Sequence, residues 1–287
     1  MKKILLHLEK DAKTSAFDQI TAYDAGVDMV IPYGGVLPED VESLVYGAIF
    51  TRGADKLKNT AIFVGGTNVA EAEELFERVG KTFFASFRVS VMFDANGSNT
   101  TAAAAVVKIL RVLGSPAGQK AVVLAGTGPV GTRAAVLLAR EGCRTFLSSR
   151  SFSRAEDTCR RIKERFGMDV APMEVKDDAD CRKAMDGTQM VFCSGKPGVL
   201  LLKKEIWSTM PALKVIADVN AVEPPGVEGT KATDNGKDRE GKIVFGALGI
   251  GNFKMKVHKG AIAGLFERND QIMDVFSIFE LAKNIQD

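Results

Sequence analysis

Cysteine is scarce in this sequence, and its spacing excludes two common kinds of site. The four cysteines stand far apart and form no CxxC pair, at Cys143, Cys159, Cys181 and Cys193. Such spacing is typical of reduced, partly buried thiols in a cytoplasmic protein, and it suits neither a disulfide framework nor a zinc site. We therefore expect no metal site and a cytoplasmic location.

The chain also lacks an excess of charge of one sign and any long hydrophobic run. Its 38 basic residues nearly balance its 36 acidic ones, so the formal net charge is +2, and no long basic stretch predicts a nucleic-acid partner. No apolar run approaches the roughly 20 residues that span a bilayer. The apolar segment after Lys2 and Lys3 ends at Glu9, which is too early for an export signal. We expect neither membrane nor nucleic-acid binding.

Strand-like and helix-like segments alternate through the first hundred residues, with no internal repeat and no low-complexity linker. The clearest helix is Val69–Lys81, where Val69, Ala72, Leu75, Phe76 and Val79 recur at three- and four-residue steps. We expect strands at 4–8, 28–32, 59–64 and 89–93, and further helices at 15–25 and 38–45. This order predicts an α/β unit with a largely parallel sheet.

A polar loop at 94–101 precedes a helical run at 102–113, and Ser98 or Asn99 is the expected cap of that helix. The cap would leave unpaired backbone N–H groups at the helix start. The segment 114–118 is rich in glycine and ends the helix. From Lys120 a second alternation of strands and helices begins. We expect a domain formed by 1–113 with the helical segment 258–287, and a second domain at 114–257.

The second domain opens with a dinucleotide-binding pattern. A buried strand at 121–125 leads into Gly126-Thr127-Gly128-Pro129-Val130-Gly131, and a helix follows at 132–140. By itself this spacing is weak evidence, but here it lies between a strand and a helix, as the mechanism requires. Gly128 leaves room for a pyrophosphate, Gly131 allows close packing of helix on strand, and the helix start supplies backbone N–H groups. We therefore predict a Rossmann-type domain.

The end of the next strand, 144–148, indicates which dinucleotide. An NAD-binding domain usually has Asp or Glu there, but this chain has Ser148, Ser149, Arg150 and Ser151, with Arg154 soon after. A guanidinium and serine hydroxyls can bind a 2′-phosphate, and no carboxylate repels it. NADP is favoured, dual use with NAD stays open, and these residues could instead be ordinary exposed loop residues.

Four later segments could end at the ligand-binding edge of the sheet, namely 190–195, 215–220, 224–226 and 245–251. Asp218 and Asn220 alternate in phase, and they either face a ligand or cap neighbouring turns. The glycines near 246–251 would let a flat ring lie close to the backbone. If residues 254–258 are extended, Lys254, Lys256 and His258 share one face, either as solvated residues or as a lysine near the substrate.

With these residues in view, the whole chain resembles the NADP-dependent methylene-tetrahydromethanopterin dehydrogenases of one-carbon-oxidising bacteria. The resemblance is carried by five segments: Asp94-Ala-Asn-Gly-Ser-Asn-Thr-Thr-Ala, Val122-Val-Leu-Ala-Gly-Thr-Gly-Pro-Val-Gly, Phe245-Gly-Ala-Leu-Gly-Ile-Gly, Thr51-Arg52-Gly53 and Ala61-Ile-Phe-Val-Gly-Gly66. It implies a Rossmann-type NADP domain, a smaller α/β pterin domain and an interdomain cleft for the pterin. Asn252 and Phe253 depart from the glycine-rich stretch expected there.

The resemblance also implies a set of site residues. Asp18, Asp218 and Lys256 are the candidate catalytic residues, and the candidates for the pterin are Asp18, Ser98, Asn99, Thr100, Lys254 and Lys256. The expected cofactor residues are Gly126, Thr127, Gly128, Pro129, Val130, Gly131, Ser149, Arg150, Arg154, Ser194, Gly195, Asn220 and Gly249. Oxidation of a methylene bridge releases a hydride and leaves a methenyl cation, so no general base is required. We expect a homo-oligomer.

Three other functions stay open at this point. The same fold could oxidise methylene-tetrahydrofolate, or act as a shikimate- or amino-acid-dehydrogenase-like enzyme with a Lys–Asp pair beside a hydroxyl or amine. The chain could also be a non-catalytic NADP-binding sensor. The polar loop at 94–101 argues weakly against a sensor, which needs no second ligand site.

Overall fold

The chain folds into two compact units, seen in a computed structural model that describes all residues from 1 to 287. Unit 1 comprises Met1–Thr100 with Met255–Asp287, and unit 2 comprises Thr101–Lys254. The divisions therefore fall within two helices, α4 (Ser98–Leu113) and α9 (Ala247–Gly264), rather than in loops. The sequence placed these divisions later, at 113/114 and 257/258. None of the helices combines the length and the apolar character that a membrane span requires.

Unit 1 is built on a five-stranded parallel sheet in the order β12-β4-β3-β1-β2. Its strands are β1 (Ile4–Leu8), β2 (Met29–Tyr33), β3 (Thr60–Val64), β4 (Ser90–Phe93) and β12 (Ile272–Met273). Its further helices are α1 (Ala16–Asp24), α2 (Val41–Phe50), α3 (Val69–Thr82) and α10 (Val275–Asn284), with 3-10 turns η1 (Pro38–Asp40), η2 (Ala54–Asn59) and η3 (Ala95–Gly97). The C-terminal segment was expected to be wholly helical, but β12 adds the edge strand beside β4.

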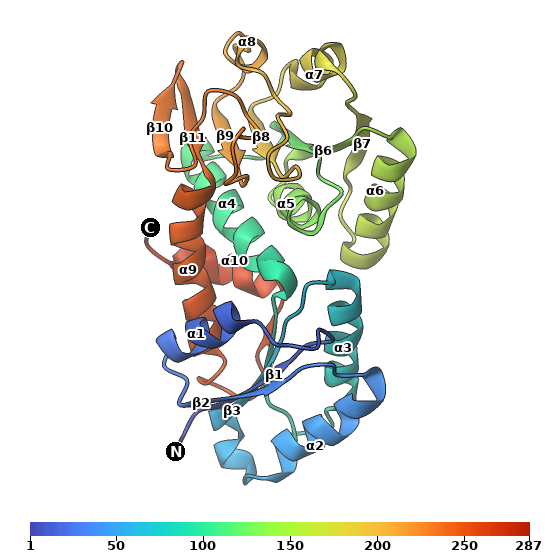
Figure 1. The fold of residues 1–287 in the computed structure, drawn as a ribbon, viewed down its shortest axis with the longest axis vertical. Helices are drawn as coiled ribbons and strands as arrows, with labels where there is room; N and C mark the ends of the chain where they lie inside the picture. The colour runs from blue at the N-terminus through green and yellow to red at the C-terminus, as the bar shows by residue number, and fades with distance from the viewer. The chain divides into compact units, whose positions relative to one another are not determined.

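The two faces of this sheet differ in chemistry because side chains alternate along each strand. Leu6 and Leu8 of β1 lie with Ile62 and Val64 of β3 in an apolar core that residues of α2 and α3 complete. In Figure 1, α2 and α1 lie on opposite sides of these strands. The alternate residues, including His7, point away from that core. One face of unit 1 is therefore the core that packs against α2 and α3, and the other carries His7 among buried apolar side chains such as Leu5 and Phe63.

Unit 2 is a seven-stranded sheet in the order β10-β11-β9-β8-β5-β6-β7, parallel except for the β10 edge. Its strands are β5 (Lys120–Leu124), β6 (Arg144–Ser149), β7 (Ala171–Glu174), β8 (Met190–Cys193), β9 (Val215–Asp218), β10 (Asn235–Arg239) and β11 (Lys242–Phe245). The helices between them are α5 (Pro129–Arg140), α6 (Phe152–Phe166), α7 (Asp178–Met185) and α8 (Lys204–Trp207). This strand order is that of the Rossmann fold, so the predicted fold class is confirmed.

The residues at 254–258 correct one prediction. They were treated as a possible extended segment that puts Lys254, Lys256 and His258 on one face, but they lie within α9. The buried residues Ile250, Phe253, Val257 and Ala261 recur at helical spacing, and that periodicity outweighs a five-residue alternation. Consequently Lys254 is buried, whereas Lys256 is exposed and its Nζ donates to the carbonyl of Gln286 at 3.4 Å.

All four cysteines are free and buried, which leads to a testable prediction. Burial raises the pKa of Cys143, Cys159 and Cys181 to about 11, and it raises the pKa of Cys193 above its ordinary value. At pH 8 only about one such thiol in a thousand is ionised, and the thiolate is the reactive form. We expect the native protein to react slowly with Ellman's reagent at pH 8 and the urea-unfolded chain to release four equivalents at once. Rapid reaction of any native thiol would contradict this.

Candidate functional sites in the two units

The glycine motif of unit 2 lies at the carboxyl end of β5, where the strand order reverses between β5 and β8. Ligands gather at such switch points in doubly wound sheets. Gly128 is the N-cap of α5, and Pro129 occupies its first turn, where a missing backbone N–H costs nothing. The backbone N–H groups that follow Pro129 point toward any anion at this helix end. The sequence prediction of strand, glycine turn and helix is confirmed.

The three glycines of the motif have different surroundings. A Cβ on Gly131 would lie 2.6 Å from Gly126 Cα and 2.7 Å from the Gly126 carbonyl oxygen, so this position has no room for a side chain. A Cβ on Gly126 would lie 2.7 Å from a Val123 methyl group. In contrast, a Cβ on Gly128 would meet no atom within 4 Å. Gly128 therefore borders open space at the start of α5, as a pyrophosphate-binding position requires.

The residues expected to bind the 2′-phosphate lie directly after β6. Ser149 Oγ accepts from the backbone N–H of Ser151, and Ser151 caps α6 by accepting from the N–H of Arg154. Arg150 and Arg154 are exposed, and neither forms an ion pair within the protein. Two uncommitted guanidiniums beside a helix N-terminus provide a suitable site for an additional phosphate.

Other predicted residues of unit 2 have structural roles. Asp218 is 1% exposed, and its two carboxylate oxygens accept from the backbone N–H groups of Asn220 and Val227. Burial raises the pKa of Asp218 despite these hydrogen bonds. Asn220 bonds to Val222 and Pro224 and so closes the following turn. These contacts are those of the turn-capping alternative, and a catalytic role for Asp218 or a cofactor role for Asn220 stays a prediction.

Ser194 and Gly249 also contact neighbouring groups of the protein, and these contacts explain the residue type at each position. Ser194 follows β8 at the switch point, and its Oγ lies 3.4 Å from the Leu124 carbonyl. Gly195 follows it, and a Cβ there would contact Leu201. A Cβ on Gly249 would clash with the Asp234 carbonyl, so this glycine accommodates the protein's own backbone. Whether a nicotinamide ring also lies here stays a prediction.

The loop at 94–101 in unit 1 is organised by Asp94, which sequence reasoning did not single out. Asp94 is fully buried, and its Oδ1 accepts from the backbone N–H groups of Asn99 and Thr100. Its Oδ2 accepts from Thr100 Oγ1 at 2.6 Å. The prediction that Ser98 or Asn99 caps α4 and leaves these N–H groups unpaired is wrong. A capping carboxylate five and six residues before the N–H groups that it caps is hard to detect, because only the bend of η3, with Asn96 at φ 53°, brings it back to them.

Ser98, Asn99 and Thr100 are buried, and their hydroxyl and amide groups form hydrogen bonds that stabilise this loop. Ser98 Oγ donates to the Ala95 carbonyl, and Asn99 Nδ2 donates to the Phe93 carbonyl. Their predicted contact with substrate is not tested by these bonds and stays a prediction.

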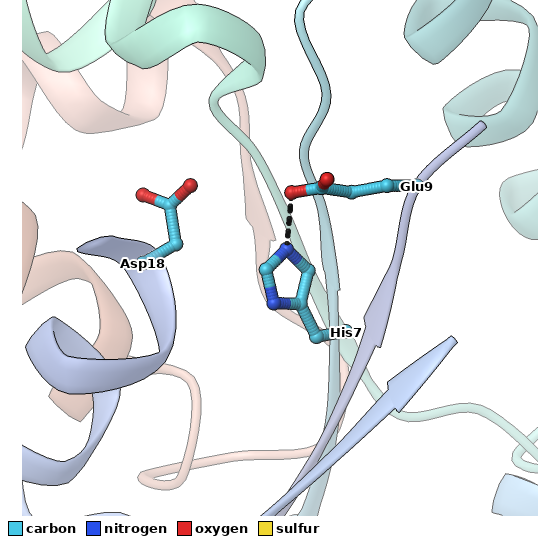
Figure 2. A group of neighbouring side chains, drawn as sticks. All are labelled: His7, Glu9 and Asp18. Atoms are coloured by element: carbon cyan, nitrogen blue, oxygen red, sulfur yellow. Dashed lines mark hydrogen bonds and ion pairs between the residues drawn. The ribbon is translucent and has the colours of Figure 1, made fainter. Parts of the chain in front are cut away.

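Titratable side chains gather at the carboxyl end of β1, the switch point of the unit 1 sheet between β1 and β3 (Figure 2). His7 Nε2 lies 2.7 Å from Glu9 Oε1, and both side chains are almost fully buried. Since an ionised carboxylate only accepts, His7 donates from Nε2. Asp18, near the start of α1, faces this pair, and one ligand-type atom from each of the three residues lies within 4.8 Å of the others.

His258 of α9 connects this cluster with Asp94. Its Nε2 lies 3.7 Å from Asp18 Oδ1, and its Nδ1 lies 3.9 Å from Asp94 Oδ2. Its ring stacks on Phe63 at a centroid distance of 5.9 Å. Two imidazoles therefore lie among three carboxylates in unit 1, and Asp18 is the most exposed of these carboxylates at 14%.

Of this cluster, the sequence prediction included only Asp18 as a site residue. His7 was expected within a strand, Glu9 only marked the end of an apolar segment, and His258 was placed on one face of a possible extended segment. The available signal was the pair His7 and Glu9 in phase at the end of an otherwise apolar strand. Two polar side chains on one face of a buried strand end indicate a site in α/β sheets.

Comparison with known proteins identifies the family to which the chain belongs. Residues 16–96 match the family model for the N-terminal domain of methylene-tetrahydromethanopterin dehydrogenase. Two relatives from Methylorubrum extorquens align with 99% of this chain and 99% of their own length: the "Bifunctional protein MdtA" at 45% identity, and an "NAD(P)-dependent methylenetetrahydromethanopterin dehydrogenase" at 32%. The chain belongs to the methylene-tetrahydromethanopterin dehydrogenase family. The resemblance inferred from the sequence motifs is thereby confirmed.

Solved structures extend the comparison to the fold alone. A quinate dehydrogenase from Corynebacterium glutamicum in complex with NAD matches with a TM-score of 0.50 at 14% identity, over 98% of each chain. An ornithine carbamoyltransferase from Pyrococcus furiosus matches with a TM-score of 0.59 at 11% identity, over 92% of this chain and 83% of its own. The second protein is not named as a dehydrogenase, so the shared architecture does not by itself specify a reaction.

Proposed function

We propose that this protein reversibly transfers a hydride between NADP and the methylene carbon of methylene-tetrahydromethanopterin, giving the methenyl form. The observation that carries the proposal is the full-length relationship to a protein named as an NAD(P)-dependent dehydrogenase of this substrate. The glycine motif at the switch point of unit 2 supplies a fitting dinucleotide site, because Gly128 borders open space at a helix N-terminus.

We propose that unit 2 binds NADP and that unit 1 binds the pterin. NADP, when bound, supplies the hydride acceptor, and the substrate that has lost the hydride is a cation. The protein contributes alignment and electrostatics, and no side chain needs to take a proton. Glu9, Asp18 and Asp94 favour a positive charge in unit 1, and Asp18 is the carboxylate most accessible to a substrate. Lys256 is exposed, and we propose that it orients the pterin through its polar groups rather than acting as a base.

The coenzyme preference depends on Arg150 in this proposal, with Arg154 as a second cation. We expect Arg150→Ala to raise the Michaelis constant for NADP about tenfold to a hundredfold, because a charge-assisted hydrogen bond to the 2′-phosphate is lost. The Michaelis constant for NAD should change by less than about threefold. Initial rates with each coenzyme measure both values. Arg160→Ala, which removes an exposed arginine of α6 that pairs with Asp157, is the matched control and should change neither. Equal effects on NADP and NAD would reject this assignment.

The reaction itself is tested by absorbance at 340 nm. Purified protein is mixed with NADP or NAD and with methylene-tetrahydromethanopterin or methylene-tetrahydrofolate. Rapid reduction of NADP with the methanopterin substrate is expected. Activity only with the folate derivative would keep the reaction and change its substrate. No reduction with either, despite binding of NADP, would favour a hydroxy- or amino-acid dehydrogenase or a sensor.

We further propose that the protein is a cytoplasmic homo-oligomer. Four buried, unpaired thiols support a reducing compartment. An exposed aromatic cluster on unit 1 supports self-association: the rings of Tyr46, Phe50, Phe84 and Phe87 contact one another at centroid distances of 5.4–5.8 Å. Exposed apolar patches of this kind often mark protein interfaces. Light scattering of the wild type and of a Phe50→Ser variant tests the oligomer, and a monomeric wild type would refute it.

A further inference from the structure

One carboxylate oxygen in unit 1 is committed to no partner within the protein, although its residue is almost fully buried. The Glu9 side chain is 2% exposed, and its Oε1 accepts from His7 Nε2 and from the backbone N–H of Ser15. Oε2 makes no hydrogen bond within the chain, yet it is not sealed from solvent. A buried carboxylate oxygen needs a donor, so this geometry is that of a site with a ligand or water facing Oε2.

The surroundings hold Glu9 in one orientation. Gly65 follows β3, and a Cβ there would lie 2.7 Å from Glu9 Oε1 and 3.0 Å from His7 Nε2. The absence of a side chain at Gly65 thus gives the His7–Glu9 pair its space. His7 itself is fixed by edge-to-face contact with Phe63 at 5.0 Å. Two hydrogen bonds to Oε1 and a fixed imidazole leave Oε2 as the carboxylate atom available to a ligand.

The groups around Glu9 suit a flat ligand that carries hydrogen-bond donors or positive charge. Phe17, on the same turn of α1 as Asp18, is 52% exposed, and its ring centre lies 6.2 Å from that of His258. An exposed ring beside carboxylates offers a stacking surface to a planar ligand that carries hydrogen-bond donors. An organic ligand with hydrogen-bond donors suits the site better than a metal ion, because His7 Nε2 is already engaged in the hydrogen bond with Glu9 Oε1.

We infer that Glu9 recognises the 2-amino-4-oxopyrimidine edge of the reduced pterin, with Oε2 accepting from its 2-amino group. His7 acts as a positioning residue that keeps Oε1 occupied and Oε2 available. This inference depends on the proposed function for its ligand, and it adds the residue that distinguishes the pterin head group. A donor edge meeting a fixed, charged acceptor explains why a carboxylate is buried at this strand end.

Glu9→Gln is the direct test, because the orientation of the new amide is set by its neighbours. The donors of His7 and Ser15 hold the amide oxygen at the Oε1 position, so the NH2 group takes the place of Oε2. The NH2 group of the glutamine and the donor group of the pterin edge then face each other, and neither can accept a hydrogen bond. We expect the Michaelis constant for the methylene pterin to rise about tenfold to a hundredfold, with that for NADP unchanged. Glu74→Gln, an exposed carboxylate of unit 1 paired with Lys10, is the control and should change neither.

A substrate analogue gives a test that needs no variant of Glu9. Wild-type protein should use the 2-desamino form of the methylene pterin with a Michaelis constant about tenfold or more above that of the normal substrate. The Glu9→Gln variant should discriminate between the two pterins much less. His7→Leu should raise the Michaelis constant for the methylene pterin. His7→Gln keeps a hydrogen-bond donor, so its Michaelis constant should lie close to that of the wild type.

The outcomes separate this inference from the proposed function. If wild-type protein reduces NADP with the methylene pterin but Glu9→Gln has an unchanged pterin constant, the inference is wrong and the function stands. If Glu9→Gln fails to fold, equal use of the normal and 2-desamino pterins by the wild type overturns the inference. Failure of the wild type to reduce NADP with either reduced pterin would refute the proposed function, and the inference with it.

Discussion

Replacing Gly131 by alanine should lower the free energy of unfolding by about 2–3 kcal/mol and weaken NADP binding at least tenfold. The new methyl group would lie 2.6 Å from Gly126 Cα and 2.7 Å from its carbonyl oxygen. Both atoms belong to the backbone, so no side-chain rotation relieves the contact. The start of α5 would have to move away from the end of β5, and the backbone N–H groups that face the coenzyme phosphates would move with it.

Gly128→Ala is the matched variant for this experiment. It lies three residues away in the same turn, its φ of −80° and ψ of 172° suit alanine, and its Cβ would meet nothing within 4 Å. We expect its stability to stay within about 0.5 kcal/mol of the wild type. Its NADP affinity should still fall about tenfold, because the methyl group occupies the space of the pyrophosphate.

Urea unfolding and equilibrium titration with NADP measure the two effects separately. Loss of affinity with unchanged stability in Gly128→Ala, beside loss of both in Gly131→Ala, is the expected pattern. Wild-type stability in Gly131→Ala would mean that α5 does not pack on β5 at the separation described. Wild-type NADP affinity in Gly128→Ala would place the coenzyme elsewhere.

Replacing Asp94 by alanine is expected to cost about 3–4 kcal/mol of stability, more than the loss of an ordinary helix cap. Asp94 accepts from two backbone N–H groups and from Thr100 Oγ1, all in a buried setting. Without the carboxylate, the N–H groups of Asn99 and Thr100 are left buried and unsatisfied. Asp94→Asn keeps one acceptor oxygen and should cost less.

The control for Asp94 is Asn68→Ala at the start of α3. Asn68 Oδ1 accepts from the N–H groups of Ala70 and Glu71, but these bonds are exposed to water, which replaces the lost acceptor. A cost of about 1 kcal/mol is expected there. Urea unfolding followed by circular dichroism compares the three variants. Equal costs for Asp94→Ala and Asn68→Ala would show that burial of the Asp94 cap adds nothing.

The alternation of strands and helices through the first 113 residues could be predicted from the sequence because it depends on local periodicity. Val69–Thr82 shows this most clearly, since its apolar residues recur at helical steps and Asn68 caps it. Residues 254–258 show the limit of the method. Five residues that alternate in polarity fit a strand, and only the longer pattern of Ile250, Phe253, Val257 and Ala261 reveals the helix.

The cluster of His7, Glu9, Asp18, Asp94 and His258 shows a second limit. Its members lie up to 251 positions apart in the chain, and no spacing rule joins them. They meet because β1 and β3 are neighbours in the sheet and because α1, α4 and α9 all approach its carboxyl end. Asp18 was predicted only through the family resemblance, while the partners that define its surroundings were not.

The sequence alone determined the fold class, the glycine turn of the dinucleotide site and the family, because the motifs that indicate each are runs of contiguous residues. Only the tertiary structure decided which buried carboxylates have both oxygens occupied by hydrogen bonds within the protein. Asp218 and Asp94 have both oxygens bonded within the protein, whereas Glu9 keeps Oε2 available. The physical reason is that hydrogen-bond donors reach these carboxylates from distant segments, so satisfaction of a buried charge is a property of the folded chain.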